Sequence, residues 1–195
     1  MLTKKELIWR EILFQALENK TLEFTQKALA KKFGVSLSTV FNALKVPRAS
    51  GAIVVRGRGF SVRDTEKFLT IWATFRNLSK DTVYQTHFDG SALEIEGLLP
   101  PETIWTTYSA YRQKFGDSPA DYDRVYVYAY ANGLPELKKR FPAKKGSPNL
   151  TVLNADPLLN NYGSLAPLPQ LYVDLWNAPE WYAKYFVNAL RDKIF

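Results

Sequence analysis

Two stretches of this 195-residue chain carry side chains that can bind a polyanion. In "SLSTVFNALK", the polar residues on one side of the helical pattern are Ser38, Thr39, Asn42 and Lys45. In "VVRGRGF", Arg56 and Arg58 stand two positions apart beside glycines. Hydroxyl and amide groups read base edges, and arginines bind phosphates or enter the minor groove. These residues therefore predict contact with nucleic acid.

Carboxylates in the second part of the chain suggest a different chemistry. They are Glu94, Glu96, Asp117, Asp121, Asp123, Asp156 and Asp174. The Asp121-x-Asp123 pair is of a type that holds a divalent metal in nuclease or nucleotidyl-transfer reactions. No glycine-rich phosphate loop or catalytic lysine accompanies it, and "SPADYDR" favours a turn whose aspartates bond their own backbone. We expect no catalytic residue, no metal and no cofactor, and keep a metal-dependent nuclease or nucleotidyltransferase as the alternative.

The composition excludes several other classes of site. The chain has no cysteine, so disulfides, thiolate nucleophiles and cysteine-ligated metals are impossible, and one histidine excludes a histidine-rich metal site. That residue, His87, has no serine and carboxylate setting and is expected in a strand. No apolar run is long enough to span a membrane, and the first residues lack the apolar core of a secretory signal. We expect a soluble, cytoplasmic protein.

The positive charge is concentrated at one end of the sequence. The net charge is +7, and the first 64 residues contain 12 Lys or Arg against 5 Asp or Glu. The remaining residues are balanced, with 14 of each kind. A basic module followed by a neutral one predicts that the first meets a polyanion and the second has another task.

The spacing of apolar residues predicts three helices before residue 50. The first covers Glu6 to Asn19. Thr25 is expected to cap "QKALAKKF", which Gly34 ends, and Ser36 is expected to cap "LSTVFNALK". The third helix repeats apolar residues at the i, i+3, i+4 and i+7 positions, and its expected core residues are Leu37, Val40, Phe41 and Leu44.

The second and third of these helices resemble a helix-turn-helix motif. "LAKKFGVSLSTVFNAL" has small Ala30, a turn at Gly34, and Val40 and Leu44 to hold the helices together. In this motif the second helix enters the major groove. Any small helical hairpin is the alternative.

A hairpin is expected directly after the third helix. "GAIVV" and "GFSV" are strand-like, and "RGRG" between them contains the glycines of a tight turn. After a helix-turn-helix such a hairpin forms a wing; alternatively, its arginines protect an edge from aggregation. Pro47 should end the third helix and leave Arg48 beside the wing as a phosphate contact. The predicted DNA-binding residues are Lys31, Lys32, Ser36, Ser38, Thr39, Asn42, Lys45, Arg48, Arg56 and Arg58.

Helices and strands alternate after residue 64. Helices are expected in "DTEKFLTIWATFRNL", "PPETIWTTYSAYRQKFG", "LPELKKRF", "LPQLYVDLWN" and "PEWYAKYFVNALRDKI", and strands in "DTVYQTHF", "ALEIEGLL", "RVYVYAYA" and "NLTVLNAD". The alternating tyrosines of "RVYVYAYA" favour a strand covered on both faces over a base-stacking platform. The predicted class is α+β: a winged helix-turn-helix over residues 1–64, then a mixed α/β domain over 65–195.

The order of these features resembles the AbiEi-type antitoxin regulators of type IV toxin–antitoxin systems. The similarity covers nearly the whole chain, from the helix "EKFLTIWA" through "YSAYRQKFGDSPADYDRVYVYA" and "NLTVLNAD" to the final helices, and its most specific element is "PQLYVDLWN". The resemblance implies a DNA-binding repressor of its own operon, with a nucleotidyltransferase-like toxin encoded alongside. Gln170 and Asp174 lie in this element, and we expect them to be capping or internal hydrogen-bonding groups.

The leading hypothesis is thus a regulator that binds double-stranded DNA and acts as the antitoxin and autorepressor of such an operon. A third possibility is that the second part of the chain senses a small ligand or docks a protein.

Overall fold

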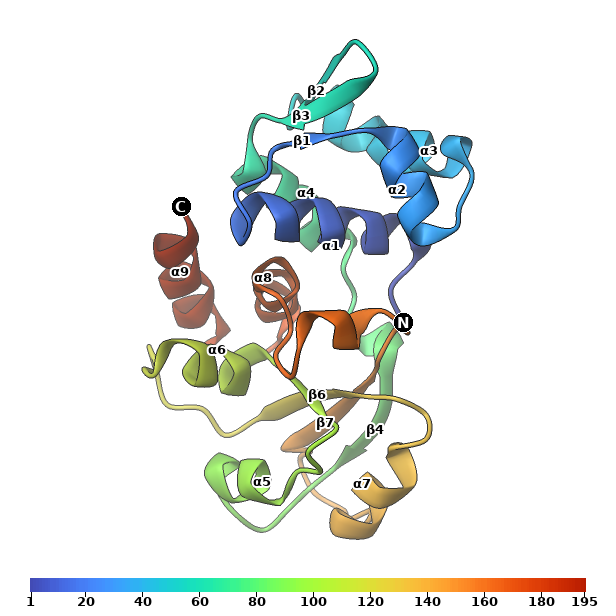
Figure 1. Ribbon diagram of the computed structural model, residues 1–195. Helices are drawn as coiled ribbons and strands as arrows, with labels where there is room; N and C mark the ends of the chain where they lie inside the picture. Colours follow the sequence, from blue (N-terminus) through green and yellow to red (C-terminus); the bar gives the residue numbers. More distant parts are fainter.

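The computed structural model describes residues 1–195 and has a mixed α+β architecture with nine α-helices and two sheets (Figure 1). The first sheet joins three antiparallel strands in the order β1-β3-β2. The elements around it are α1 (Lys4–Leu17), β1 (Glu23–Phe24), α2 (Gln26–Phe33), α3 (Leu37–Ala49), β2 (Ile53–Arg56) and β3 (Gly59–Val62).

The predicted start and end of α2 and the predicted start of α3 are confirmed. The Thr25 side chain accepts a hydrogen bond from the Ala28 backbone N–H, and the Ser36 side chain accepts one from Thr39. Gly34 ends α2 with a φ of 59°, a conformation that glycine adopts without strain. The chain therefore turns sharply between α2 and α3 where the sequence predicts it.

The prediction that Pro47 ends the third helix is wrong, because α3 continues through Pro47 to Ala49. Proline has no backbone N–H, so the carbonyl of Ala43, four residues earlier, lacks its helical donor. The indole N–H of Trp9 donates to that carbonyl at 2.8 Å. Arg48 consequently lies on α3 itself.

The predicted core face of α3 is also partly wrong. Leu37 and Phe41 are 55% and 45% exposed. The buried residues are instead Val40, Ala43, Leu44 and Pro47. These four positions have the same i, i+3, i+4 and i+7 spacing, so the helix is rotated about its axis relative to the expectation.

The second sheet contains four strands in the order β4-β7-β6-β5, with β6 and β7 parallel and the outer pairs antiparallel. The elements of this part are α4 (Thr65–Phe75), the 3₁₀ turn η1 (Ser79–Asp81), β4 (Thr82–Thr86), α5 (Ala92–Leu98), β5 (Ile104–Thr106), α6 (Thr107–Phe115), β6 (Val125–Ala129), α7 (Leu134–Arg140), β7 (Leu150–Asn154), the 3₁₀ turn η2 (Leu159–Tyr162), α8 (Leu168–Asn177) and α9 (Ala183–Ile194).

Two expected elements of this part differ in the structure. "ALEIEGLL" is the helix α5 and not a strand; Ser91 and Glu94 form a capping box at its start. The stretch after Pro101 begins with strand β5, which pairs with β6 before α6 starts. The S-x-x-E spacing of a capping box indicates a helix start here, but the alternation of apolar residues with glutamates suggested a strand instead. His87 lies just beyond the end of β4.

The prediction that "RVYVYAYA" is covered on both faces is confirmed, because every residue of β6 is buried. Val125, Val127 and Ala129 pack with α5, α7 and β7 in one hydrophobic cluster. On the opposite face, Tyr126 and Tyr128 belong to clusters that include residues of α6, α8 and η2. The tyrosines therefore serve as packing groups.

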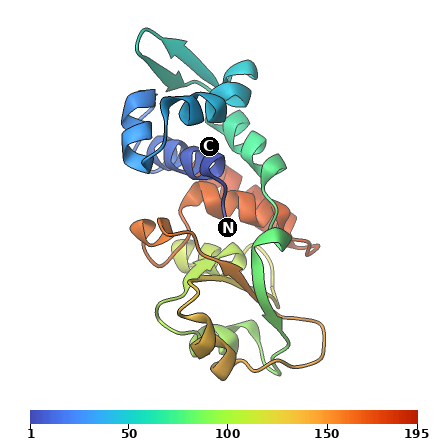
Figure 2. The same ribbon diagram turned by 90° about the vertical axis from the view of Figure 1, so that its right-hand side faces the viewer.

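Helix α8 lies between the two sheets (Figure 2). It contacts α1 and α4 on one side and α6 and α9 on the other, and every residue from Pro169 to Leu175 is buried. The largest hydrophobic cluster accordingly includes residues from both ends of the chain, such as Trp9, Phe60, Leu171 and Phe186. No helix has the length and apolar character needed to cross a membrane.

Candidate nucleic-acid interface

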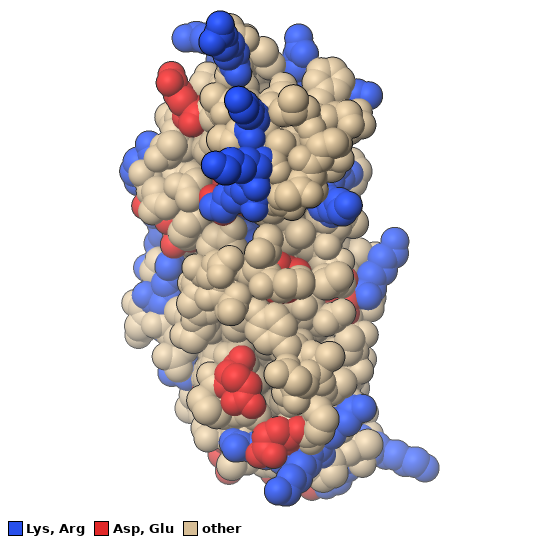
Figure 3. Space-filling view, turned by 45° about the vertical axis from the view of Figure 1, so that its right-hand side comes forward, with Lys and Arg blue, Asp and Glu red and all other residues tan.

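Residues 25–63, which form α2, α3 and the β2–β3 hairpin, contain eight Lys or Arg residues and no Asp or Glu. All eight are exposed: Lys27, Lys31, Lys32, Lys45, Arg48, Arg56, Arg58 and Arg63. Lysine and arginine side chains accordingly line the upper part of the face in Figure 3. The acidic residues of α1, by contrast, turn inward: Glu6 and Glu11 are buried. The fold thus separates the two signs of charge more sharply than the sequence totals do.

Only one of these eight cations has a carboxylate partner. Lys32 forms an ion pair with Glu11 of α1, whose second oxygen accepts a hydrogen bond from Tyr162 at 2.7 Å. Burial raises the pKa of Glu11, but the bonds from Lys32 and Tyr162 outweigh burial and lower that pKa below its ordinary value. Lys32 is thereby held against α1, whereas Lys31 makes no ion pair.

The outward face of α3 carries the polar groups that the sequence singles out. Ser38, Asn42 and Lys45 are exposed, and Thr39 is half-buried. The hydroxyl of Ser36 lies 2.9 Å from those of both Ser38 and Thr39, while it also caps the helix. The exposed side chains of Asn42 and Lys45 form no hydrogen bond within the protein, and the Lys45 ammonium contacts only the Phe41 ring, so both polar groups are available to a ligand.

The β2–β3 hairpin lies against one flank of α3. A groove of about 280 Å³ runs between them, lined by Phe41, Lys45 and Arg48 of α3 and by Val55 of β2. The hairpin turn is formed by Gly57, with a φ of 52°, and Arg58. Glycine is suited to this turn because positive φ costs it little. Arg48, Arg56 and Arg58 are thus presented on one exposed end of the molecule.

A larger hollow of about 570 Å³ lies between α1, β1, α2 and β3. The stacked rings of Phe24 and Phe60 line it, together with Lys32 and Arg56. Arg56 therefore lines this hollow, whereas its neighbour Val55 lines the groove beside α3. Sequence reasoning missed this hollow, because it forms only where β3 folds back beside the first three elements of the chain.

The carboxylates of the alternative hypothesis are dispersed, and most of them bond to other residues of the protein, whereas Asp121 is exposed and forms no ion pair. Glu94 caps α5, and Glu96 pairs with Arg112. The Asp123 carboxylate was expected to bond its own backbone, but it instead accepts a hydrogen bond of 2.6 Å from the hydroxyl of the distant Tyr182. No group of three or more His, Asp or Glu residues is placed to hold a metal ion.

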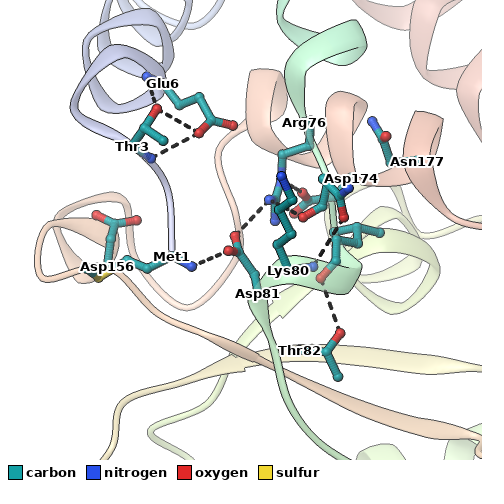
Figure 4. A network of polar contacts seen from close by, with 12 residues as sticks. Met1, Thr3, Glu6, Arg76, Lys80, Asp81, Thr82, Asp156, Asp174 and Asn177 are labelled. Carbon is teal, nitrogen blue, oxygen red and sulfur yellow. Dashed lines mark hydrogen bonds and ion pairs between the residues drawn. The ribbon is translucent and has the colours of Figure 1, made fainter.

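Two buried arginines are bound by carboxylates: the contacts of Arg10 join the first part of the chain to the second, and those of Arg76 lie within the second part. Arg10 of α1 binds both oxygens of Asp156 at 2.6 and 2.7 Å and also donates to Gln170 of α8 at 2.8 Å. Arg76, at the end of α4, donates to Asp174 and Asp81 at 2.8 and 2.7 Å (Figure 4). Gln170 and Asp174 are thus internal hydrogen-bonding groups, as the sequence predicts.

The Asp174 carboxylate is held by three donors. Besides Arg76, Thr106 and Tyr128 donate hydroxyl hydrogen bonds to it at 2.8 and 2.6 Å. Complete burial nevertheless raises the pKa of Asp174 above its ordinary value, and the three donors oppose that rise. This network is a structural junction beneath α4, remote from the exposed cations of α2, α3 and the hairpin.

Comparison of the chain with protein-family models, with curated proteins and with solved structures gives no significant match in any of the three.

Proposed function

We propose that the protein is a transcriptional regulator that binds double-stranded DNA through residues 1–64. In this proposal α2 and α3 form a helix-turn-helix, α3 is the recognition helix, and the β2–β3 hairpin is the wing. Ser38, Thr39 and Asn42 would read base edges, and Lys45, Arg48, Arg56 and Arg58 would bind phosphates or the minor groove.

One observation carries the proposal: the surface of α2, α3 and the hairpin has eight exposed cations and no carboxylate. A polyanion gains counterion release at such a surface, and the nearest exposed carboxylate, Glu23, lies outside it on β1, beside β3. The polar side chains of α3 lie within this surface and have few partners inside the protein. A helix with free hydrogen-bonding groups among unpaired cations fits the major groove of a duplex better than it fits a neutral ligand.

The test is duplex binding as a function of salt concentration. Wild-type protein and the Arg56→Ala/Arg58→Ala variant are titrated into a fluorescent DNA duplex, and the slope of log K against log [salt] is measured. The loss of two phosphate contacts should weaken binding to every sequence and reduce the slope by about two.

A matched control removes the same charge elsewhere. Lys138→Ala/Lys139→Ala alters two exposed cations of α7, at the opposite end of the molecule, and should leave the slope unchanged. If the hairpin variant binds with wild-type affinity and slope, the wing assignment fails. If the wild type binds no duplex, the regulator proposal fails as a whole.

A narrower form of the proposal is that this regulator is a cytoplasmic antitoxin that represses its own operon. The resemblance to AbiEi-type antitoxins is its support, and the implied partner is a nucleotidyltransferase-like toxin. Footprinting on the promoter upstream of its own gene tests the autorepressor role. Co-purification with the product of the adjacent gene tests the partner, and the absence of both results would remove the antitoxin role while leaving DNA binding intact.

A further inference from the structure

We infer that Leu37 and Phe41 read the C5-methyl groups of thymine in the major groove, so that two apolar side chains determine part of the sequence specificity. This inference rests on the proposed function. It concerns residues that the spacing of the sequence assigns to the core and that the structure leaves 55% and 45% exposed.

The two side chains form a row along the first half of α3. Leu37 and Phe41 are four residues apart, and the polar pair Ser38 and Asn42 repeats the same spacing one position later. The N-terminal half of a recognition helix is the part that reaches base edges. An apolar row and a polar row would therefore meet the floor of the groove side by side.

The surroundings of Phe41 specify what can cover it. Its ring lines the groove of about 280 Å³ between α3 and β2, with Val55 opposite. Lys45 and Arg48 also line this groove, and the Lys45 ammonium lies 5.6 Å from the centre of the Phe41 ring. This apolar surface is bordered by cations, and α2, α3 and the β2–β3 hairpin carry no carboxylate. Such a surface fits an apolar group that belongs to a polyanion.

The methyl group of thymine is such a group. It is the apolar group that a base pair presents in the major groove, and contact with phenylalanine or aliphatic side chains distinguishes thymine from the other bases. An apolar protein partner would not require the surrounding excess of positive charge. The charge pattern thus favours DNA over a second protein as the occupant.

The experiment removes single methyl groups from the DNA. Duplexes that bind tightly are first selected from a randomised pool, and each thymine of the selected site is then replaced by deoxyuridine, which differs only in lacking the C5-methyl. At contacted positions the affinity of the wild type should fall about fourfold for each methyl removed, because the burial of one methyl group against the protein is lost. Phe41→Ala should bind thymine and deoxyuridine duplexes equally at one or more of these positions, and Leu37→Ala at others.

Leu93→Ala, which truncates a 60% exposed leucine of α5, is the control and should keep the wild-type response to deoxyuridine. Since Leu37 and Phe41 are exposed, their truncation should not unfold the protein, and thermal denaturation checks this. Two outcomes overturn this inference alone. In the first, the wild type binds selected sequences but no replacement of thymine by deoxyuridine changes its affinity. In the second, Leu37→Ala and Phe41→Ala both lose as much affinity on that replacement as the wild type does. Failure to select any sequence overturns the proposed function with it.

Discussion

The indole N–H of Trp9 donates a hydrogen bond of 2.8 Å to the backbone carbonyl of Ala43, the carbonyl that Pro47 leaves without a helical donor. Trp9 is completely buried in α1, and Ala43 and Pro47 belong to the buried face of α3. A contact between two helices thus replaces a hydrogen bond within one helix. It also fixes how α3 is rotated, and with it which side chains α3 exposes.

Replacing Trp9 by phenylalanine should destabilise the protein by about 1–3 kcal/mol beyond the loss of packing, because a buried carbonyl then has no donor. In a Pro47→Ala background this additional cost should disappear, since the new backbone N–H of residue 47 can donate to Ala43. Urea denaturation of the four proteins of this double-mutant cycle measures the coupling. Trp181→Phe, at a 73% exposed tryptophan, is the control. Equal costs of Trp9→Phe in both backgrounds would contradict the assigned hydrogen bond.

Breaking the buried pair of Arg10 and Asp156 should cost more than the Trp9 substitution. Arg10→Met leaves the Asp156 carboxylate buried without its arginine, and loss of one partner of a buried pair costs about 3–5 kcal/mol. Arg10 Nε and Gln170 Nε2 have no hydrogen-bond partner even in the intact network. The double variant Arg10→Met/Asp156→Leu should therefore recover much of the loss in chemical denaturation. A double variant less stable than Arg10→Met would show that the pair itself provides net stability.

Glu11 should make the stability dependent on pH below about 4.5, its ordinary pKa. Its pKa is lowered in the folded state, so its ionised form stabilises the fold above the ordinary value, and that contribution is lost as the pH falls through the lower, folded-state value. The difference in unfolding free energy between wild type and Glu11→Gln should thus be constant near neutral pH and shrink in acid. Denaturation curves at several pH values test this, and a difference that stays constant down to pH ~3 contradicts it.

Asn42 should influence which base is preferred more than it influences overall affinity. An asparagine pairs with adenine through two hydrogen bonds worth about 1–3 kcal/mol of discrimination. Asn42→Ala should therefore relax base preference at one position of a selected site while the salt dependence of binding stays unchanged. Asn188→Ala, at an exposed position of α9, is the matched control. An unchanged set of selected sequences would remove Asn42 from the reading residues.

The sequence by itself determined the local features of this protein. The ends of α2, the start of α3, the glycine turn of the hairpin and the two-sided burial of β6 all depend on residues close together in the chain. Caps, turns and strong periodicity act over a few residues, so they can be recognised without the fold. The S-x-x-E capping box of α5 was equally local, but the alternating Leu93 and Ile95 suggested a strand instead.

The tertiary structure alone decided which face of α3 is exposed. The rows beginning at Leu37 and at Val40 both satisfy helical spacing, and the first contains the larger apolar side chains. Close packing against α1 selects the second row, since small Ala43 and Pro47 allow the Trp9 indole to reach the backbone. The buried pair of Arg10 and Asp156 was likewise invisible, because its partners lie 146 positions apart. Contacts of this kind depend on how distant segments meet, and no local pattern records that.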